Sequence, residues 1–163
     1  MPMTSKERVL DRERNRGRLA ALDLAGRAKD LDGTAIIAEE DHIPAWSENA
    51  VYTADHVGFP VQDKGQVYTI LMPHTPAHNP GSRPADLRAI YSLLHTKDPA
   101  KAKPWMESYG TSGLYRIDEC CTWPHPDGTT HVHRNKQDNN QYPPLTLNVE
   151  HYWEDLGEVT KWQ

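Results

Sequence analysis

The chain has 163 residues, and its 18 Lys and Arg against 23 Asp and Glu give a formal net charge of −5. This length fits one domain or two very small ones, and the negative balance argues against a DNA-binding protein, because DNA is bound through basic surfaces. Hydrophobic residues make up 37% of the chain, below the roughly 45–50% of ordinary domains, so we expect thin cores.

The sequence shows no sign of a membrane span, a signal peptide or a disulfide scaffold. No run reaches the ~18 apolar residues that a membrane helix needs, and the first residues lack the apolar core of a signal peptide. We therefore expect a soluble protein that is not exported by that route. The two cysteines, Cys120 and Cys121, are adjacent, and neighbours rarely form a disulfide because the ring is strained.

The first predicted element is a helix over residues 4–31, because Thr4 to Glu7 match a capping box and no proline occurs in the rest of this segment. A narrow seam recurs every seven residues, at Leu10, Gly17, Leu24 and Leu31, with Arg14, Ala21 and Ala28 between them. The charged residues 6–18 indicate a solvated face, or alternatively a basic arm for an acidic partner. A lone amphipathic helix cannot bury its stripe. The helix must therefore pack either on its own domain or on copies of itself, and we favour self-association.

After Pro44 short β-type runs alternate with Pro, Gly, Asn and Asp, which predicts a mainly β body. A weak internal repeat divides it: an aromatic anchor, a Gly turn between two strands, a polar pair and a closing aromatic occur twice in the same order. The fold class predicted is therefore mainly β with an N-terminal α-helix and two small tandem antiparallel β modules. The predicted organisation is a helix and lead-in over 1–43, modules over 44–94 and 104–163, and an exposed linker over 95–103.

The repeat resembles the small chitin-binding modules (type 3), and more closely their duplicated form in phage tail proteins. The matching segments are Pro44-Ala45-Trp46, Gly65-Gln66-Val67-Tyr68, Pro73-His74-Thr75, Asp138-Asn139-Asn140 and Tyr152-Trp153-Glu154-Asp155-Leu156-Gly157. The resemblance covers about Leu19 to Gly157. It implies compact antiparallel modules in a protein encoded by a phage or prophage.

The resemblance also suggests where sugar would bind. The family often carries an exposed aromatic before the proline that follows the polar pair, and such a ring can stack on a sugar. The second copy has Tyr142 there, whereas the first has Asn79, and the family's closing Trp is replaced by Tyr91 in the first copy. We therefore expect the second module to dominate any binding. The change to Tyr91 is compatible with a core role if its hydroxyl reaches a partner.

The other aromatic residues divide between core and contact. We assign the repeat-anchoring rings to the cores: Trp46, Trp105, Trp153, Tyr52, Tyr68 and Tyr115. Trp123 precedes Pro124 in an insertion with a second proline at 126, which predicts an exposed loop because proline interrupts strand pairing. The candidate carbohydrate-binding residues are therefore Tyr142, Trp123 and Trp162, with simple packing as the alternative.

Metal binding and catalysis are both disfavoured. Thiols and imidazoles that suggest zinc occur at Cys120, Cys121, His125, His131 and His133, but adjacent cysteines do not have the two-to-four-residue spacing of structural zinc sites. We expect no metal and no cofactor. The carboxylate clusters at residues 39–41 and 154–155 read as solvated runs, and no nucleophile-elbow, P-loop or zinc-protease motif occurs. We do not expect an enzyme.

These expectations favour a non-enzymatic phage or prophage tail-associated protein, located in the virion, that attaches to a polysaccharide or cell-surface glycan. Its other expected partners are tail proteins and copies of itself, with no nucleic acid and no membrane insertion. One alternative is a structural tail adaptor that has lost sugar binding. Another is an accessory module that serves a separate glycoside hydrolase.

Overall fold

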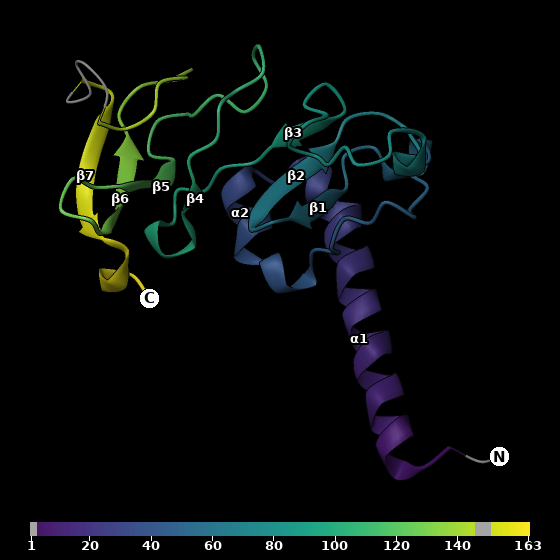
Figure 1. The fold of residues 1–163 in the computed structure, drawn as a ribbon. Coiled ribbons are helices and arrows are strands. Elements are labelled where there is room, and N and C mark those ends of the chain that lie inside the picture. The colour runs from purple at the N-terminus through teal and green to yellow at the C-terminus, as the bar shows by residue number, and fades with distance from the viewer. Residues whose placement is uncertain (1–2, 146–150) are drawn as a thin grey trace.

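The computed structural model describes residues 3–145 and 151–163, and it consists of an N-terminal helix followed by two small β-sheets (Figure 1). This arrangement confirms the predicted mainly β fold with an N-terminal helix. Short 3-10 helices connect the elements, at Ala28–Asp30, Glu40–His42, Ala54–His56, Pro76–His78, Pro99–Lys101 and Val159–Lys161. Within the described residues, no helix is both long and apolar enough to cross a membrane.

Helix α1 (Ser5–Arg27) extends away from both sheets (Figure 1). The predicted capping box is present: the Thr4 hydroxyl accepts from the Glu7 amide at 3.2 Å, and the Glu7 carboxylate accepts from the Thr4 amide at 2.6 Å. Residues 3–19 are all exposed. The first part of the helix is therefore held by its cap and its own hydrogen bonds, not by packing within the chain.

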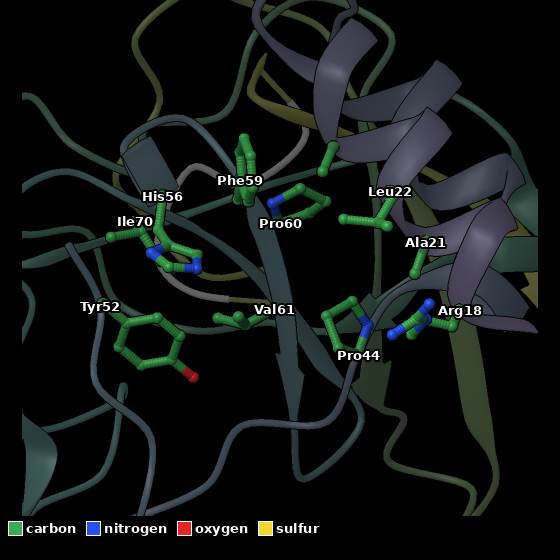
Figure 2. Close-up of a pocket in the computed structure, with 11 residues that line it drawn as sticks. Arg18, Ala21, Leu22, Pro44, Tyr52, His56, Phe59, Pro60, Val61 and Ile70 are labelled. Atoms are coloured by element: carbon green, nitrogen blue, oxygen red, sulfur yellow. The ribbon is translucent and has the colours of Figure 1, made fainter. Parts of the chain in front are cut away.

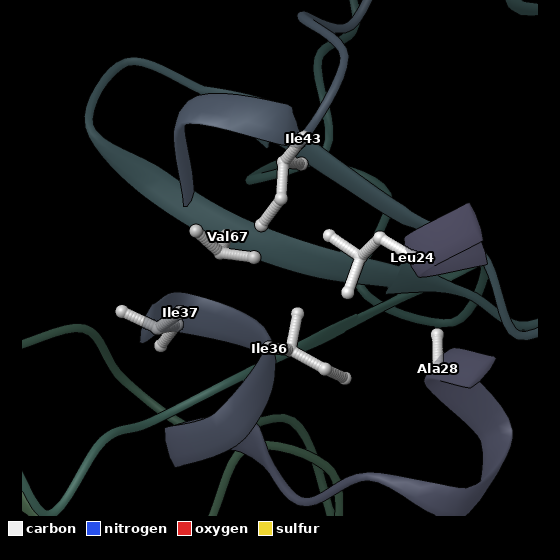
Figure 3. Packing of buried hydrophobic residues seen from close by; sticks show 6 residues of the cluster. All are labelled: Leu24, Ala28, Ile36, Ile37, Ile43 and Val67. Carbon is white, nitrogen blue, oxygen red and sulfur yellow. The ribbon is translucent and has the colours of Figure 1, made fainter. Parts of the chain in front are cut away.

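The last turns of α1 pack against their own domain. Leu24 is fully buried, and the cluster around it is formed by Leu24, Ala28, Ile36, Ile37, Ile43 and Val67 (Figure 3). Two of these residues come from helix α2 (Gly33–Ala38), which the sequence analysis did not predict. The Asp32 carboxylate caps α2 by accepting from the Ala35 amide at 2.8 Å. The C-terminal half of the heptad seam therefore packs against residues of the same chain.

The first sheet has the antiparallel order β1 (Pro60–Asp63), β2 (Gln66–Ile70) and β3 (Tyr91–Leu93). Lys64 and Gly65 both have positive φ, at 48° and 76°, which suits a tight two-residue hairpin turn. Tyr91 is fully buried, and its hydroxyl accepts from Trp46 Nε1 at 2.8 Å and also bonds to His74. Tyr91 is therefore a core residue, and its hydroxyl has the partners that this role requires.

The second sheet has the order β4 (Lys103–Pro104), β5 (Cys120–Pro124), β6 (Thr130–Asn135) and β7 (Trp153–Glu158). The two-residue strand β4 pairs parallel with β5, and the other pairs are antiparallel. Its core contains Tyr115, Cys121 and Trp153, with the Tyr115 and Trp153 rings edge to face at 5.0 Å. Aromatic area thus replaces aliphatic bulk in a module too small for a deep core.

The segment between the sheets differs from the predicted exposed linker at its start. His95 and Thr96 are buried. The His95 ring stacks on Tyr115 with centroids 3.6 Å apart, and the Cys120 amide donates to the Thr96 carbonyl at 2.7 Å. The expectation of exposure is wrong for these two residues because they complete the aromatic core of the second sheet.

Burial of His95 makes stability depend on pH. Desolvation lowers the pKa of His95 to about 4, whereas an unfolded chain has a His pKa of about 6.5. Between these values the unfolded state binds a proton that the folded state does not, so stability falls as pH falls through this window. The loss reaches about 3 kcal/mol near pH 4.

Urea unfolding of the wild type and of His95→Gln measures this loss: the wild type should lose more stability on acidification. Parallel pH profiles would contradict this prediction, and His78→Gln, at an exposed position, is the control.

Candidate functional site

A groove in the second module contains the exposed aromatic ring predicted from the sequence. The side chain of Tyr142 is 49% exposed. The groove is lined by Trp105, Glu107, Ser108, Gly110, Gln141, Tyr142 and Pro143. Its lining thus combines two aromatic rings with a carboxylate, a hydroxyl and a carboxamide, which are the groups that recognise a sugar's apolar face and its hydroxyls.

Buried asparagines hold Tyr142 in place. The Tyr142 amide donates to the Asn140 side chain at 2.9 Å, and the Asn140 amide group donates to the Asn135 side chain at 2.8 Å. Asn135 in turn donates to the Arg116 carbonyl at 2.7 Å. Both asparagines are buried, so their polar groups depend on these bonds. Asn140, the second residue of the motif's polar pair, is therefore a structural support for the ring that follows it.

The other side of Tyr142 is fixed by the module's core. Its carbonyl accepts from Trp153 Nε1 at 2.8 Å, and its ring lies against Tyr152 with centroids 5.3 Å apart. Because Trp153 is buried, this bond joins the groove directly to the core. The Tyr142 backbone is held from two directions while its ring stays open to solvent.

Trp105 and Trp123 lie together next to this groove. Trp105, which we assigned to the core, is only partly buried and lines the groove. The expectation that Trp123 lies on an exposed loop is wrong: it belongs to strand β5, pairs with His131 on β6, and its ring meets Trp105 edge to face at 5.5 Å. Pro124 is tolerated because it is the last residue of the strand.

Trp162 and the first module lie outside this groove. Trp162 follows the last 3-10 helix, is partly buried, and is not among the lining residues. In the first module, Asn79 is exposed and offers no ring, while the Arg83 guanidinium covers Trp46 at 4.8 Å from the ring centroid. Arg83 is held there by an ion pair with the buried Asp63. The first module therefore presents no open aromatic face at the corresponding position.

The residues that suggested zinc in the sequence separate into two groups. Cys120 and Cys121 are buried, and burial raises the pKa of the Cys120 thiol to about 11 and that of Cys121 well above its ordinary value. Such thiols are poor metal ligands because the thiolate is the ligating form. His125 and His131, by contrast, meet at the turn between β5 and β6, together with Asp127. The sequence reasoning did not consider this aspartate.

The acidic clusters weighed as catalytic candidates are engaged in ion pairs. Glu39 bonds to Arg27 at 3.0 Å, and Glu40 bonds to Lys103. At the other cluster, Glu154 lies 3.6 Å from Arg134. These carboxylates join α1, the first 3-10 helices and the second sheet, and none of them lines the Tyr142 groove.

A second groove, which is almost entirely apolar, lies between α1 and the first sheet (Figure 2). Helix α1 contributes Arg18, Ala21, Leu22 and Ala25, and the opposite wall is formed by Pro44, Tyr52, His56, Phe59, Pro60, Val61 and Ile70. Leu22 is 57% exposed although it borders this groove. The helix therefore keeps exposed apolar side chains next to an open apolar surface.

Comparison with known proteins does not assign a family. No protein-family model matches the chain, and the search of curated proteins finds no significant match. Functional proposals for this chain therefore rest on its side chains and their arrangement.

The support for Tyr142 can be tested by removing Asn140. Asn140→Ala removes the donor to the buried Asn135 side-chain oxygen and the acceptor of the Tyr142 amide, and we expect it to lower the free energy of unfolding by about 2 kcal/mol. Denaturant unfolding measures the change. Asn79→Ala removes the same side chain at an exposed position and should change stability by less than about 0.5 kcal/mol. Equal effects of the two substitutions would show that the asparagine network does not support the groove.

Proposed function

We propose that this chain is a non-enzymatic, phage or prophage tail-associated protein that attaches to polysaccharide on the bacterial surface through its second module. The observation that carries the proposal is the exposed ring of Tyr142, fixed through its backbone at the edge of a groove with polar side chains. A sugar ring presents an apolar face of CH groups, and an aromatic side chain held in one place stacks on it with little loss of entropy.

The polar side chains around Tyr142 support the same proposal. Glu107, Ser108 and Gln141 line the groove and supply both hydrogen-bond acceptors and donors for sugar hydroxyls. The groove is open, as binding to a long polymer requires, because an internal segment of a polysaccharide cannot enter a closed cavity. A stacking surface with a polar rim would bind one sugar unit weakly.

Weak binding becomes useful when several copies act together. Linked sites raise apparent affinity by a factor of about 10²–10⁴ without new contacts. Helix α1 would supply this multiplicity, because residues 3–19 are all exposed and an isolated helix is marginally stable in water. We therefore include self-association through α1 in the proposal.

A structural adaptor is the second candidate, and the first module favours it. Where the second module has the exposed Tyr142, the first module has Asn79, and its Trp46 is covered by Arg83. A module without an open ring has no stacking surface for sugar, so the first module would contact other tail proteins. If the second module also failed to bind polysaccharide, the whole chain would be an adaptor.

Tyr142→Ala tests sugar binding directly. Loss of the stacking face should weaken retention on chitin and on purified bacterial cell walls by roughly tenfold, since such a contact contributes about 1 kcal/mol or more. The melting temperature should change little because the ring is exposed. Affinity electrophoresis or a pull-down with the full chain measures retention.

Two further variants distinguish a residue that contacts sugar from a residue that stabilises the core. Tyr109→Ala removes another exposed tyrosine that does not line the groove, and binding should stay normal. Trp153→Ala removes a buried ring and should cost about 3–5 kcal/mol of stability. Normal binding by folded Tyr142→Ala, or an equal loss in Tyr109→Ala, would refute this site.

Self-association through α1 has its own test. We expect light scattering to give the wild type a multiple of the chain mass of 18.5 kDa. A Leu19→Gln and Leu22→Gln double variant should shift toward the single-chain mass, because both exposed leucines would lose their apolar partner surface. A Val51→Gln and Val57→Gln double variant, also at exposed positions, is the matched control. A monomeric wild type would exclude self-association.

A further inference from the structure

The turn between β5 and β6 brings together a cluster of imidazoles and carboxylates that does not line the Tyr142 groove. His125, Asp127 and His131 each place a potential ligand atom within 4.8 Å of the others. His125 Nδ1 lies 3.1 Å from Asp127 Oδ1, and His131 Nε2 lies 3.6 Å from Asp127 Oδ2. Two ligands of a tetrahedral zinc ion, each about 2.1 Å from the metal, are about 3.4 Å apart. The separation between His131 Nε2 and Asp127 Oδ2 is close to that value.

Asp155 on β7 orients the central histidine of this cluster. Both of its carboxylate oxygens lie within hydrogen-bond distance of His131 Nδ1, at 2.8 and 2.9 Å. A proton on Nδ1 satisfies this bond and leaves a lone pair on Nε2, which faces Asp127. Metal-ligating histidines are typically held in this way by a carboxylate on the other ring nitrogen.

The lone pair on His131 Nε2 has no suitable partner in the described part of the chain. It is buried and makes no hydrogen bond, and the closest carboxylate oxygen, on Asp127, is too distant for one. A lone pair and an anionic oxygen that face each other repel unless a cation lies between them. The side chain of His131 is only 12% exposed, so water screens this repulsion weakly.

His133 lies beside His131 but is not a proposed ligand. It follows His131 by two residues on β6, its ring lies 6.4 Å from that of His131, and it is fully buried. Its ring atoms are not among those that cluster with His125 and Asp127. Buried polar groups are nearly always bonded, so the unpartnered Nε2 of His131 is the atom that points to a ligand from outside the chain.

We propose that His125, Asp127 and His131 bind a divalent transition-metal ion of the zinc class, with Asp155 as the positioning residue of His131. Two imidazoles and a carboxylate suit such an ion, whereas calcium and magnesium prefer oxygen ligands alone. The Thr129 amide and hydroxyl both donate to Asp127 Oδ1, at 2.9 and 2.6 Å. These bonds leave Oδ2 for the metal.

All three proposed ligands belong to the β5–β6 hairpin: His125 and Asp127 lie in its turn and His131 lies on β6. The site is connected to β7 only through the hydrogen bonds between Asp155 and His131. A bound ion would therefore stabilise the tip of this hairpin. This inference departs from the sequence expectation of no metal because the fold supplies Asp127 and Asp155, neither of which was weighed as a ligand.

Calorimetric titration of zinc into the untagged, chelator-treated full chain tests the proposal. We expect one equivalent of zinc per chain and a higher melting temperature in its presence. His131→Asn and Asp127→Asn should abolish stoichiometric binding, and Asp155→Asn should weaken it by roughly 10–100-fold. His78→Asn, an exposed histidine of the first module, should bind like the wild type.

Circular dichroism of the metal-free proteins separates loss of ligand from loss of fold. His125 and Asp127 are in a turn and partly exposed, so His125→Asn should keep the wild-type spectrum and still lose zinc. The proposal is overturned if the wild type binds less than one equivalent, or if folded His125→Asn and His131→Asn bind zinc as tightly as the His78→Asn control. Either result would leave polysaccharide retention by Tyr142 untouched.

Discussion

The stacking of His95 on Tyr115 is the contact on which the arrangement of the two sheets depends. The rings lie face to face at 3.6 Å, and His95 also bonds to the Gly113 carbonyl at 2.8 Å. On the other side of this segment, Gly33 of α2 packs so closely that a Cβ would lie 2.2 Å from the His95 carbonyl oxygen. The helical lead-in, the end of the first sheet and the core of the second therefore meet at one buried residue.

Tyr115 connects the buried junction at His95 to the candidate site. Its backbone pairs with Asn140 through two hydrogen bonds of 3.0 Å, and its ring packs on Trp153, which holds the Tyr142 carbonyl. The exposed ring of Tyr142 is thus two contacts away from the junction between the sheets. The proposed metal site lies on the same sheet, and none of its three ligands lines the groove, so sugar binding and metal binding can be lost separately.

Features that depend on neighbouring residues could be predicted from the sequence, whereas features that depend on contacts between distant residues could not. The Thr4 cap, the Gly65 turn and the polar partner of Tyr91 follow from short motifs or from the chemistry of one side chain. The burial of His95 depends on Tyr115, 20 positions away, and no local signal marks it. The strand position of Trp123 depends on pairing with His131 across the β5–β6 turn. Likewise, Asp155 meets His131 only because β7 pairs with β6. The Asp32 cap before Ile36 and Ile37 was a readable signal for α2.

The five Trp residues allow a direct measurement of whether the Tyr142 groove of the second module binds sugar. Nitrogen-15 spectra of the full chain, recorded during titration with soluble chitin oligosaccharides, resolve each indole N–H. If the groove binds sugar, the indole signals should shift progressively for Trp105, which lines the groove, and for Trp153, which bonds to the Tyr142 carbonyl. The indole of Trp46, covered by Arg83 in the first module, should not move. Shifts confined to Trp46, or no shift of any indole at saturating oligosaccharide, would show that this groove does not bind sugar.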